Sequence, residues 1–191
     1  MVVDGAKAFL EAWNLVQSNK TCKASQPQKD RWEKPPQDWY KLNVDAAINS
    51  TSRATGLGCI LRNSRGEFVA ARETKWYGCY QSKLAEAISI REALLWLKEM
   101  QFDRVLVETD ALLVIQGLKD HDSNSSFGLI LEDICKIAND FDCISFAFVK
   151  QSANMVAHKL AREPVFIADC REWVDAAPLF ISDVILLDIS N

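Results

Sequence analysis

The sequence has no long apolar run, and this absence argues against a membrane protein. None of its uninterrupted apolar stretches reaches the roughly 20 residues that a membrane helix needs. The first residues, MVVDGAKAFLEAWNLVQ, carry Asp4 and Glu11 where a signal peptide would place a basic region and then an apolar stretch. We therefore expect an intracellular protein of the nucleus or cytoplasm, which is not secreted and binds no membrane.

The sequence also has few residues for a soft metal centre. Its six cysteines form no CxxC pair, and their scatter argues against a zinc site and a disulfide framework. Reduced, mostly buried thiols are the simplest interpretation. The two histidines, His121 and His158, are too few for a histidine-rich metal centre.

Basic charge is scarce, because 22 Lys and Arg residues stand against 26 Asp and Glu residues. A protein that binds nucleic acid usually has a basic footprint. The charge is uneven, however: residues 53–83 hold six basic and two acidic side chains, whereas residues 164–191 hold one and five. The basic run is either a solvated hairpin surface or, beside an active site, a track for phosphate groups.

What is present is an ordinary globular composition, with 49% hydrophobic residues and enough apolar material for a core. We divide the chain into three parts. Residues 1–36 comprise a short amphipathic helix and a proline-containing linker, in which Pro35-Pro36 excludes a helix or a central strand. Residues 37–163 form the folded domain, and residues 164–191 form an acidic and apolar tail that we expect to pack against it.

The pattern of apolar residues predicts the elements of this domain. Strands are expected over residues 39–48, 56–63, 67–76, 104–109 and 143–149, and helices over 82–100, 110–119, 129–139 and 152–162. Three antiparallel strands followed by alternating strands and helices indicate an α/β fold. We predict a mixed five-stranded sheet with helices on both faces.

Three acidic residues occur where polar side chains need an explanation. Asp45 lies within a predicted strand, where aspartate is uncommon. Glu86 shares a helical face with apolar residues, and Asp110 stands where a strand stops and a helix starts. Each has an ordinary alternative: a solvated aspartate, a first-turn glutamate favoured by the helix dipole, and a helix N-cap.

Taken together, the three acids indicate a site for divalent cations. Ligands of such sheets gather at strand ends, so the three side chains are expected to converge. Converging carboxylates cannot all stay charged without cations. Oxygen ligands of this kind suit Mg²⁺.

Four motifs in order resemble the ribonuclease H-like domains of plants that are related to retroelement reverse transcriptases. The first is KLNVDAAINSTSRATGLGCILRNSRGEFVAA, close to the pattern K-x-N-x-D-G followed by a G-x-G strand. LAEAISIREAL at 84–94, VETDALLVIQGL at 107–118 and ANMVAHKLA at 153–161 follow with the usual spacing. The resemblance covers roughly residues 37–163, and four ordered motifs are far more specific than any one alone.

The resemblance implies a ribonuclease H-like fold and hydrolysis of the RNA strand of RNA–DNA hybrids. Two Mg²⁺ or Mn²⁺ ions would be held by Asp45, Glu86 and Asp110, with His158 as the fourth catalytic position. The expected partner is an RNA–DNA hybrid or another nucleic acid, and the expected state is a monomer. The substrate-binding residues that we predict are Asn154, Ala46, Arg62 and Lys83.

Several positions depart from the family pattern. His158 replaces an acidic residue, and it is either a metal ligand or proton carrier, or a helix-surface histidine near Asn154. Ala46 replaces a glycine, and its methyl group could crowd the approach of the hybrid. A loop histidine of many relatives aligns with Phe148, and a basic residue often found nearby is Gln151.

Three functions remain open at this point. The first is an active ribonuclease, which the three acids favour. The second is a catalytically degenerate module that binds nucleic acid or protein, which Ala46, Phe148 and the acidic balance favour. The third, ranked last, is a 3′-to-5′ exonuclease, since those enzymes carry D-x-E on the first strand where this chain has Asp45-Ala46-Ala47.

Overall fold

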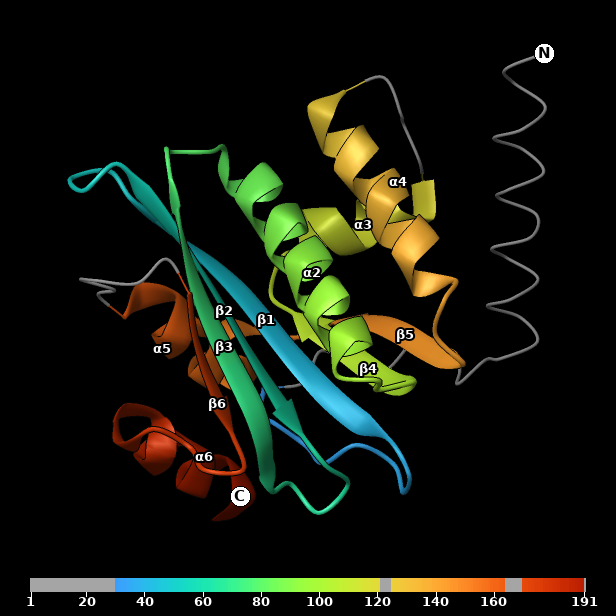
Figure 1. The fold of residues 1–191 in the computed structure, drawn as a ribbon, viewed down its shortest axis with the longest axis vertical. Helices are drawn as coiled ribbons and strands as arrows, with labels where there is room; N and C mark the ends of the chain where they lie inside the picture. Colours follow the sequence, from blue (N-terminus) through green and yellow to red (C-terminus); the bar gives the residue numbers. More distant parts are fainter. Residues whose placement is uncertain (1–29, 121–124, 164–169, 191) are drawn as a thin grey trace.

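The computed structural model describes residues 30–120, 125–163 and 170–190 (Figure 1). The predicted N-terminal helix and most of the predicted linker lie outside these residues. The elements are β1 (Tyr40–Asn49), β2 (Ala54–Arg62), β3 (Phe68–Tyr77), α2 (Ser82–Glu99), β4 (Arg104–Thr109), α3 (Leu112–Asp120), α4 (Ser126–Ala138), β5 (Cys143–Phe148), the short 3₁₀ helix η1 (Gln151–Ala153), α5 (Met155–Arg162), β6 (Cys170–Val174) and α6 (Leu179–Ser190). In the part of the chain that is described, no helix combines the length and the apolar character needed to cross a membrane.

The strands form one mixed sheet in the order β5-β4-β1-β2-β3-β6. β1, β2 and β3 pair antiparallel, whereas β4 pairs parallel with both β1 and β5. The α/β fold and the five predicted strands are therefore confirmed. The central position of β1 follows from this order, because β1 has the antiparallel hairpin on one side and the parallel strands on the other.

The sheet has a sixth strand that the sequence analysis did not predict. β6 comes from the C-terminal segment and pairs antiparallel with β3, with Ala70 opposite Val174 and Thr74 opposite Cys170. Its five residues, CREWV, show too short an alternation to indicate a strand by themselves. The last segment of the chain thus extends the sheet and then packs as α6, in line with the expectation that it packs.

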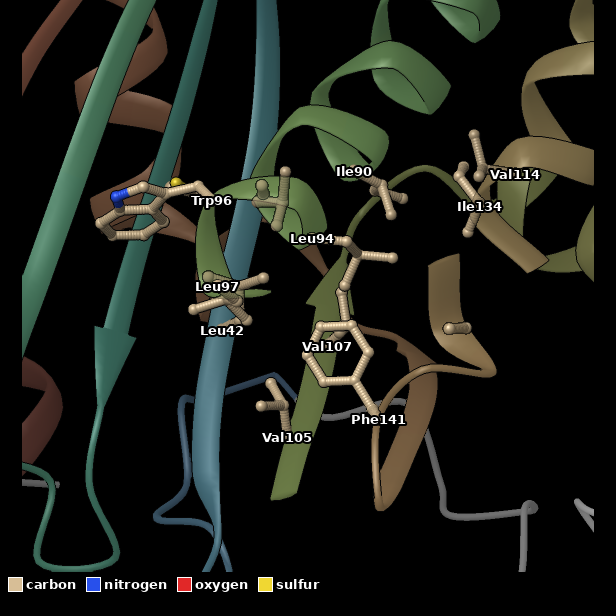
Figure 2. Close-up of a cluster of buried hydrophobic side chains, with 14 of the residues drawn as sticks. Leu42, Ile90, Leu94, Trp96, Leu97, Val105, Val107, Val114, Ile134 and Phe141 are labelled. Carbon is tan, nitrogen blue, oxygen red and sulfur yellow. The ribbon is translucent and has the colours of Figure 1, made fainter. Parts of the chain in front are cut away.

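Helices cover both faces of the sheet, as predicted. Figure 1 shows α2, α3 and α4 on one face and α5 and α6 on the other. The larger core lies under α2, where Leu94 and Leu97 meet Leu42 and Val107 of the central strands (Figure 2). On the opposite face, a smaller core joins Ile60 of β2 to residues of α5 and α6.

Two glycines of β2 let α5 lie against the sheet. A Cβ atom on Gly56 would stand 2.0 Å from the backbone oxygen of Ala161. One on Gly58 would stand 2.4 Å from the backbone nitrogen of Ala161 and 2.6 Å from the oxygen of Ala157. No side chain fits there without moving the helix, so the G-x-G pattern of this strand sets the position of α5.

We predict that Gly56→Ala destabilises the protein by about 2–4 kcal/mol, because backbone atoms of α5 cannot yield as a side chain would. Gly117→Ala is the control. A Cβ atom there would meet the end of the Leu131 side chain at 2.6 Å, and this side chain can turn away. Chemical denaturation of both variants measures the difference. Equal stability of the two variants would contradict the tight contact between β2 and α5.

Candidate active site

The parallel pairing of β1 and β4 places Asp45 and Asp110 at equivalent positions along the two neighbouring segments. Asn43 is the Cα partner of Glu108, and it is the last residue of β1 that pairs with β4. Asp45 follows Asn43 by two residues within β1, and Asp110 follows Glu108 by two residues, just after β4 ends. The carboxylate of Asp45 is buried, at 3% exposure, whereas Asp110 is half-buried immediately after β4.

Glu86 reaches this point from the second turn of α2. Its carboxyl group lies close enough to those of Asp45 and Asp110 for their charges to interact. Among the described residues, no group hydrogen bonds with the buried Oε2 atom of Glu86. α2 is tied to β1 here, since the hydroxyl of Ser89 donates to the backbone oxygen of Asp45 at 2.8 Å.

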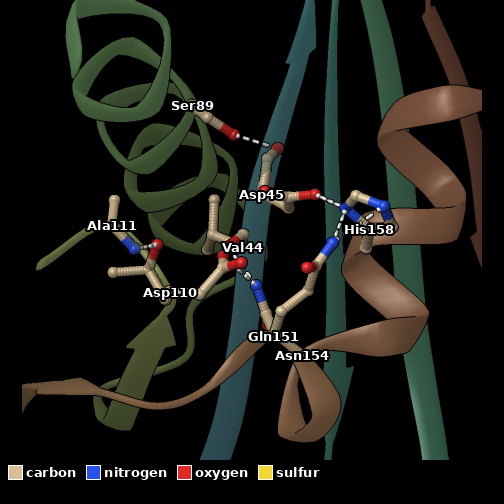
Figure 3. Close-up of polar contacts among 9 residues, drawn as sticks. Val44, Asp45, Ser89, Asp110, Ala111, Gln151, Asn154 and His158 are labelled. Atoms are coloured by element: carbon tan, nitrogen blue, oxygen red, sulfur yellow. Dashed lines mark hydrogen bonds and ion pairs between the residues drawn. The ribbon is translucent and has the colours of Figure 1, made fainter. Parts of the chain in front are cut away.

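The start of α5 holds the two aspartates from the other side (Figure 3). Asn154 donates through Nδ2 to the backbone oxygen of Val44 at 2.9 Å and to Oδ1 of Asp110 at 3.0 Å. One turn later, Nδ1 of His158 lies 2.7 Å from Oδ2 of Asp45. The amide nitrogen of Gln151 lies within 3.2 Å of the His158 ring. The site therefore draws side chains from β1, α2, the end of β4 and α5.

Burial and neighbouring charges oppose the ionisation of Glu86 and Asp45. Burial raises the pKa of Glu86 to about 9, and the charges of Asp45 and Asp110 act in the same direction. Burial and Asp110 also raise the pKa of Asp45 to about 6, although the hydrogen bond with His158 opposes this. Without a cation, Glu86 thus keeps a proton at neutral pH.

The donor set suits a hard divalent cation. Three carboxyl groups lie near one another, and the buried Oε2 atom of Glu86 is an oxygen donor that has no hydrogen bond within the described structure. As the side chains stand, however, no three Asp, Glu, His or Cys residues of the described chain are arranged to hold an ion. One oxygen of Asp45 is occupied by His158 instead.

The remaining predicted residues lie in different places. Asn154 is buried within the site, and Ala46 is half-buried beside it. Lys83 is exposed on the first turn of α2, with its ammonium 5.1 Å from the ring centre of Phe127. Asn154 and Ala46 therefore lie at the acidic cluster, whereas Lys83 contacts α4.

Arg62, also predicted to bind substrate, is not brought to the cluster. It is 1% exposed and pairs with Asp188 of α6 at 2.7 Å. Its guanidinium carbon lies 3.7 Å from the ring centre of Trp32. A side chain buried in this way cannot contact a phosphate, so the substrate role predicted for Arg62 is corrected to an internal ion pair.

Sequence reasoning missed the residues that surround the acids. Ser89 was not singled out, although it lies one turn after Glu86 on α2 and is 2% exposed. Lys41 and Asn43 match the K-x-N-x-D-G pattern, but the sequence assigned neither residue a role in the site. Their steps of two residues place them on the same side of the sheet as Asp45.

The fold is that of a ribonuclease H-like domain. Residues 43–164 match the model of the family described as reverse transcriptase-like, which is well over half of the chain. The protein therefore belongs to the reverse transcriptase-like family. A search among curated proteins gives no match.

Solved structures agree with this fold. RNase H1 of Halobacterium salinarum is 22% identical with a TM-score of 0.59, over 64% of this chain and 94% of that one. The N-terminal RNase H domain of a Mycobacterium tuberculosis protein is 17% identical with a TM-score of 0.58, over 64% and 90%. LC11-RNase H1, solved with an RNA/DNA hybrid, is 15% identical with a TM-score of 0.56, over 63% and 92%.

Proposed function

We propose that this protein is a ribonuclease that cleaves the RNA strand of RNA–DNA hybrids with the help of two divalent cations, Mg²⁺ or Mn²⁺. The observation that carries the proposal is that Asp45, Glu86 and Asp110 lie close enough together for their charges to interact. Family membership and the fold support it, and LC11-RNase H1 was solved with such a hybrid.

The acids would hold the cations, and the neighbouring side chains would orient the acids. Asp45, central in the cluster, would contact both ions, while Glu86 and Asp110 would each help to hold one. When bound, the cations would polarise the attacking water and neutralise charge on the leaving oxygen. Asn154 fixes Asp110 through its amide nitrogen. His158 can hold or release a proton next to Asp45, near the surface, with 18% of its side chain exposed.

The hybrid would approach over the exposed rim of this cluster. Ala46 is half-buried within β1, and Lys83 offers a positive charge on the first turn of α2. The minor groove of a hybrid displays the 2′-hydroxyls of its RNA strand, and these distinguish RNA from DNA without a sequence requirement. We expect products with 5′-phosphate and 3′-hydroxyl ends.

A cleavage assay with Mg²⁺ or Mn²⁺ tests this proposal. It compares four labelled substrates in parallel: an RNA–DNA hybrid, single-stranded RNA, duplex RNA and duplex DNA. Cleavage restricted to the RNA of the hybrid, and dependent on the cation, is expected. Absence of cleavage with both cations, or cleavage that survives chelation, would refute the catalytic proposal.

A binding module without catalysis is the second candidate. The contact between His158 and Asp45 favours it, because this contact occupies an oxygen that a cation would need. The two candidates differ in one result. A noncatalytic module would bind the hybrid without cutting it, and its thermal stability would not respond to Mn²⁺.

A further inference from the structure

A buried polar network lies next to the carboxylates. Its members are Lys41 and Asn43 of β1, Arg62 of β2, Glu108 of β4, Asp188 of α6 and the preceding Trp32, and we call them the strand-face network. Asn43 precedes Asp45 by two residues, and Glu108 precedes Asp110 by two residues. Side chains at steps of two point to the same face of a strand. The network therefore continues the face that carries the two aspartates.

Asn43 is the centre of the network. Its Oδ1 atom accepts hydrogen bonds from Nε1 of Trp32 and from Arg62, each at 2.9 Å. Its Nδ2 atom donates to Oε2 of Glu108 at 3.2 Å. Two donors meet the oxygen and one acceptor meets the nitrogen, so the amide has one orientation that satisfies all three partners.

The charges of the network balance inside the protein. Lys41 pairs with Glu108 at 2.6 Å, and Arg62 pairs with Asp188 at 2.7 Å. The four side chains are between 0% and 11% exposed. Buried charges of this kind are costly to desolvate, and loss of one partner leaves the other uncompensated. Each member therefore depends on the others, including Asp188 from the far end of the chain.

The network stands at the last paired position of β1 and β4. Their pairing runs from Tyr40 with Val105 to Asn43 with Glu108. Asp45 and Asp110 lie just beyond it, where the partner strand no longer holds them. The side-chain hydrogen bond between Asn43 and Glu108 links the two residues of this last backbone pair. It opposes sliding of β1 along β4, which would shift Asp45 relative to Asp110.

We infer that Lys41, Asn43 and Glu108 are positioning residues for the carboxylate cluster. The ion pair between Arg62 and Asp188 makes α6 part of the same positioning network. This inference rests on the proposed function for its link to cleavage. Its structural part, that the network sets the geometry of Asp45 and Asp110, can be tested without cleavage.

Asp188→Asn is the first test, and Asp183→Asn is its control. Asp183 lies on the same helix but pairs at the surface with Lys159 of α5 at 3.1 Å, next to His158 in the sequence. For Asp188→Asn we expect kcat on the hybrid to fall roughly 10- to 100-fold with KM little changed, as for other residues that orient ligands. The affinity for Mn²⁺ alone should fall by a similar factor. Asp183→Asn should match the wild type.

A double variant, Arg62→Met with Asp188→Leu, separates positioning from simple charge compensation. It removes both charges, so it is expected to fold even if Asp188→Asn does not. It also removes the hydrogen bond from Arg62 to Asn43. A stable double variant with low kcat and weak Mn²⁺ binding supports positioning. A double variant with wild-type kcat and Mn²⁺ affinity would overturn it.

The ring signals of His158 give a readout that needs neither cleavage nor cation. The chain has only two histidines, and Nδ1 of His158 contacts Asp45 at 2.7 Å. At fixed pH, NMR signals of this ring should shift in the double variant and not in Asp183→Asn. If the wild type fails to cleave hybrids, the proposed function fails, but this comparison still decides the positioning role. Unchanged ring signals in the double variant would refute that role.

Discussion

Asp45→Asn is expected to lower kcat for hybrid cleavage by at least about 1,000-fold, which corresponds to about 4 kcal/mol of the activation barrier. The charge of Asp45 acts on Glu86, and Oδ2 of Asp45 lies 2.7 Å from Nδ1 of His158. An asparagine has the same size but no charge, so the fold should persist while the hold on the cations is lost. Single-turnover kinetics on a labelled hybrid with Mg²⁺ measure the change.

Two comparisons keep this result specific. Asp183→Asn removes a surface carboxylate far along the chain and should cleave as the wild type does. Mn²⁺ titration of the Asp45→Asn variant should show loss of the binding seen with the wild type. If the variant retained cleavage within about tenfold of the wild type, which is about 1.4 kcal/mol, Asp45 would not hold the catalytic cations.

In the absence of divalent cations, the free energy of unfolding is expected to fall as the pH rises. The pKa of Glu86 is raised to about 9 in the folded protein, above its ordinary value of 4.5, because of burial and then of Asp45 and Asp110. The folded state thus holds a proton that the unfolded state releases, and stability falls as pH rises through this interval. Between pH 6 and 8.5, we expect the free energy of unfolding to fall by about 1 kcal/mol per pH unit.

Glu86→Gln tests the origin of this slope. Glutamine resembles the protonated side chain and cannot ionise, so the unfolding free energy of the variant should be nearly constant over the same interval. Asp45 contributes little there, because its pKa of about 6 places its own effect at lower pH. Urea denaturation at several pH values with a chelator present makes the comparison. An equal slope in wild type and variant would show that Glu86 is not the group responsible.

Divalent cations should reverse the effect of pH. A cation that binds the ionised form releases the proton of Glu86 and stabilises the folded state. At pH 8, Mg²⁺ should therefore raise the melting temperature of the wild type more than that of Glu86→Gln. The same increase in both proteins would place the bound cation away from this cluster.

Much of the fold follows from local pattern. The alternation around Asp45 predicted the central strand, and the spacing of Ile90, Leu94 and Leu97 predicted α2, whose apolar side lies in the core. Local periodicity predicts these elements because each of them buries one face in the core, so that its apolar residues recur at the period of a strand or a helix. The acids could be proposed as a group because four motifs occur in the order and spacing of a family, and membership of the reverse transcriptase-like family is confirmed.

Residues with long-range partners could not be interpreted in this way. Arg62 belongs to a run of basic residues and was predicted to meet substrate. Its partner, Asp188, is 126 positions away, and local composition carries no information about such a pair. Trp32 stands in a segment predicted to be a linker, yet it is 4% exposed and hydrogen bonded to Asn43.

The sequence by itself determined the α/β architecture and named Asp45, Glu86 and Asp110 as one group, since periodicity and motif order are local properties. Only the tertiary structure decided how these acids are held. It joined β6 to the sheet, set His158 against Asp45, and buried Arg62 with Asp188 beneath Trp32. Those outcomes depend on which distant side chains can share a buried charge or hydrogen bond, and that is settled only when the strands and helices pack together.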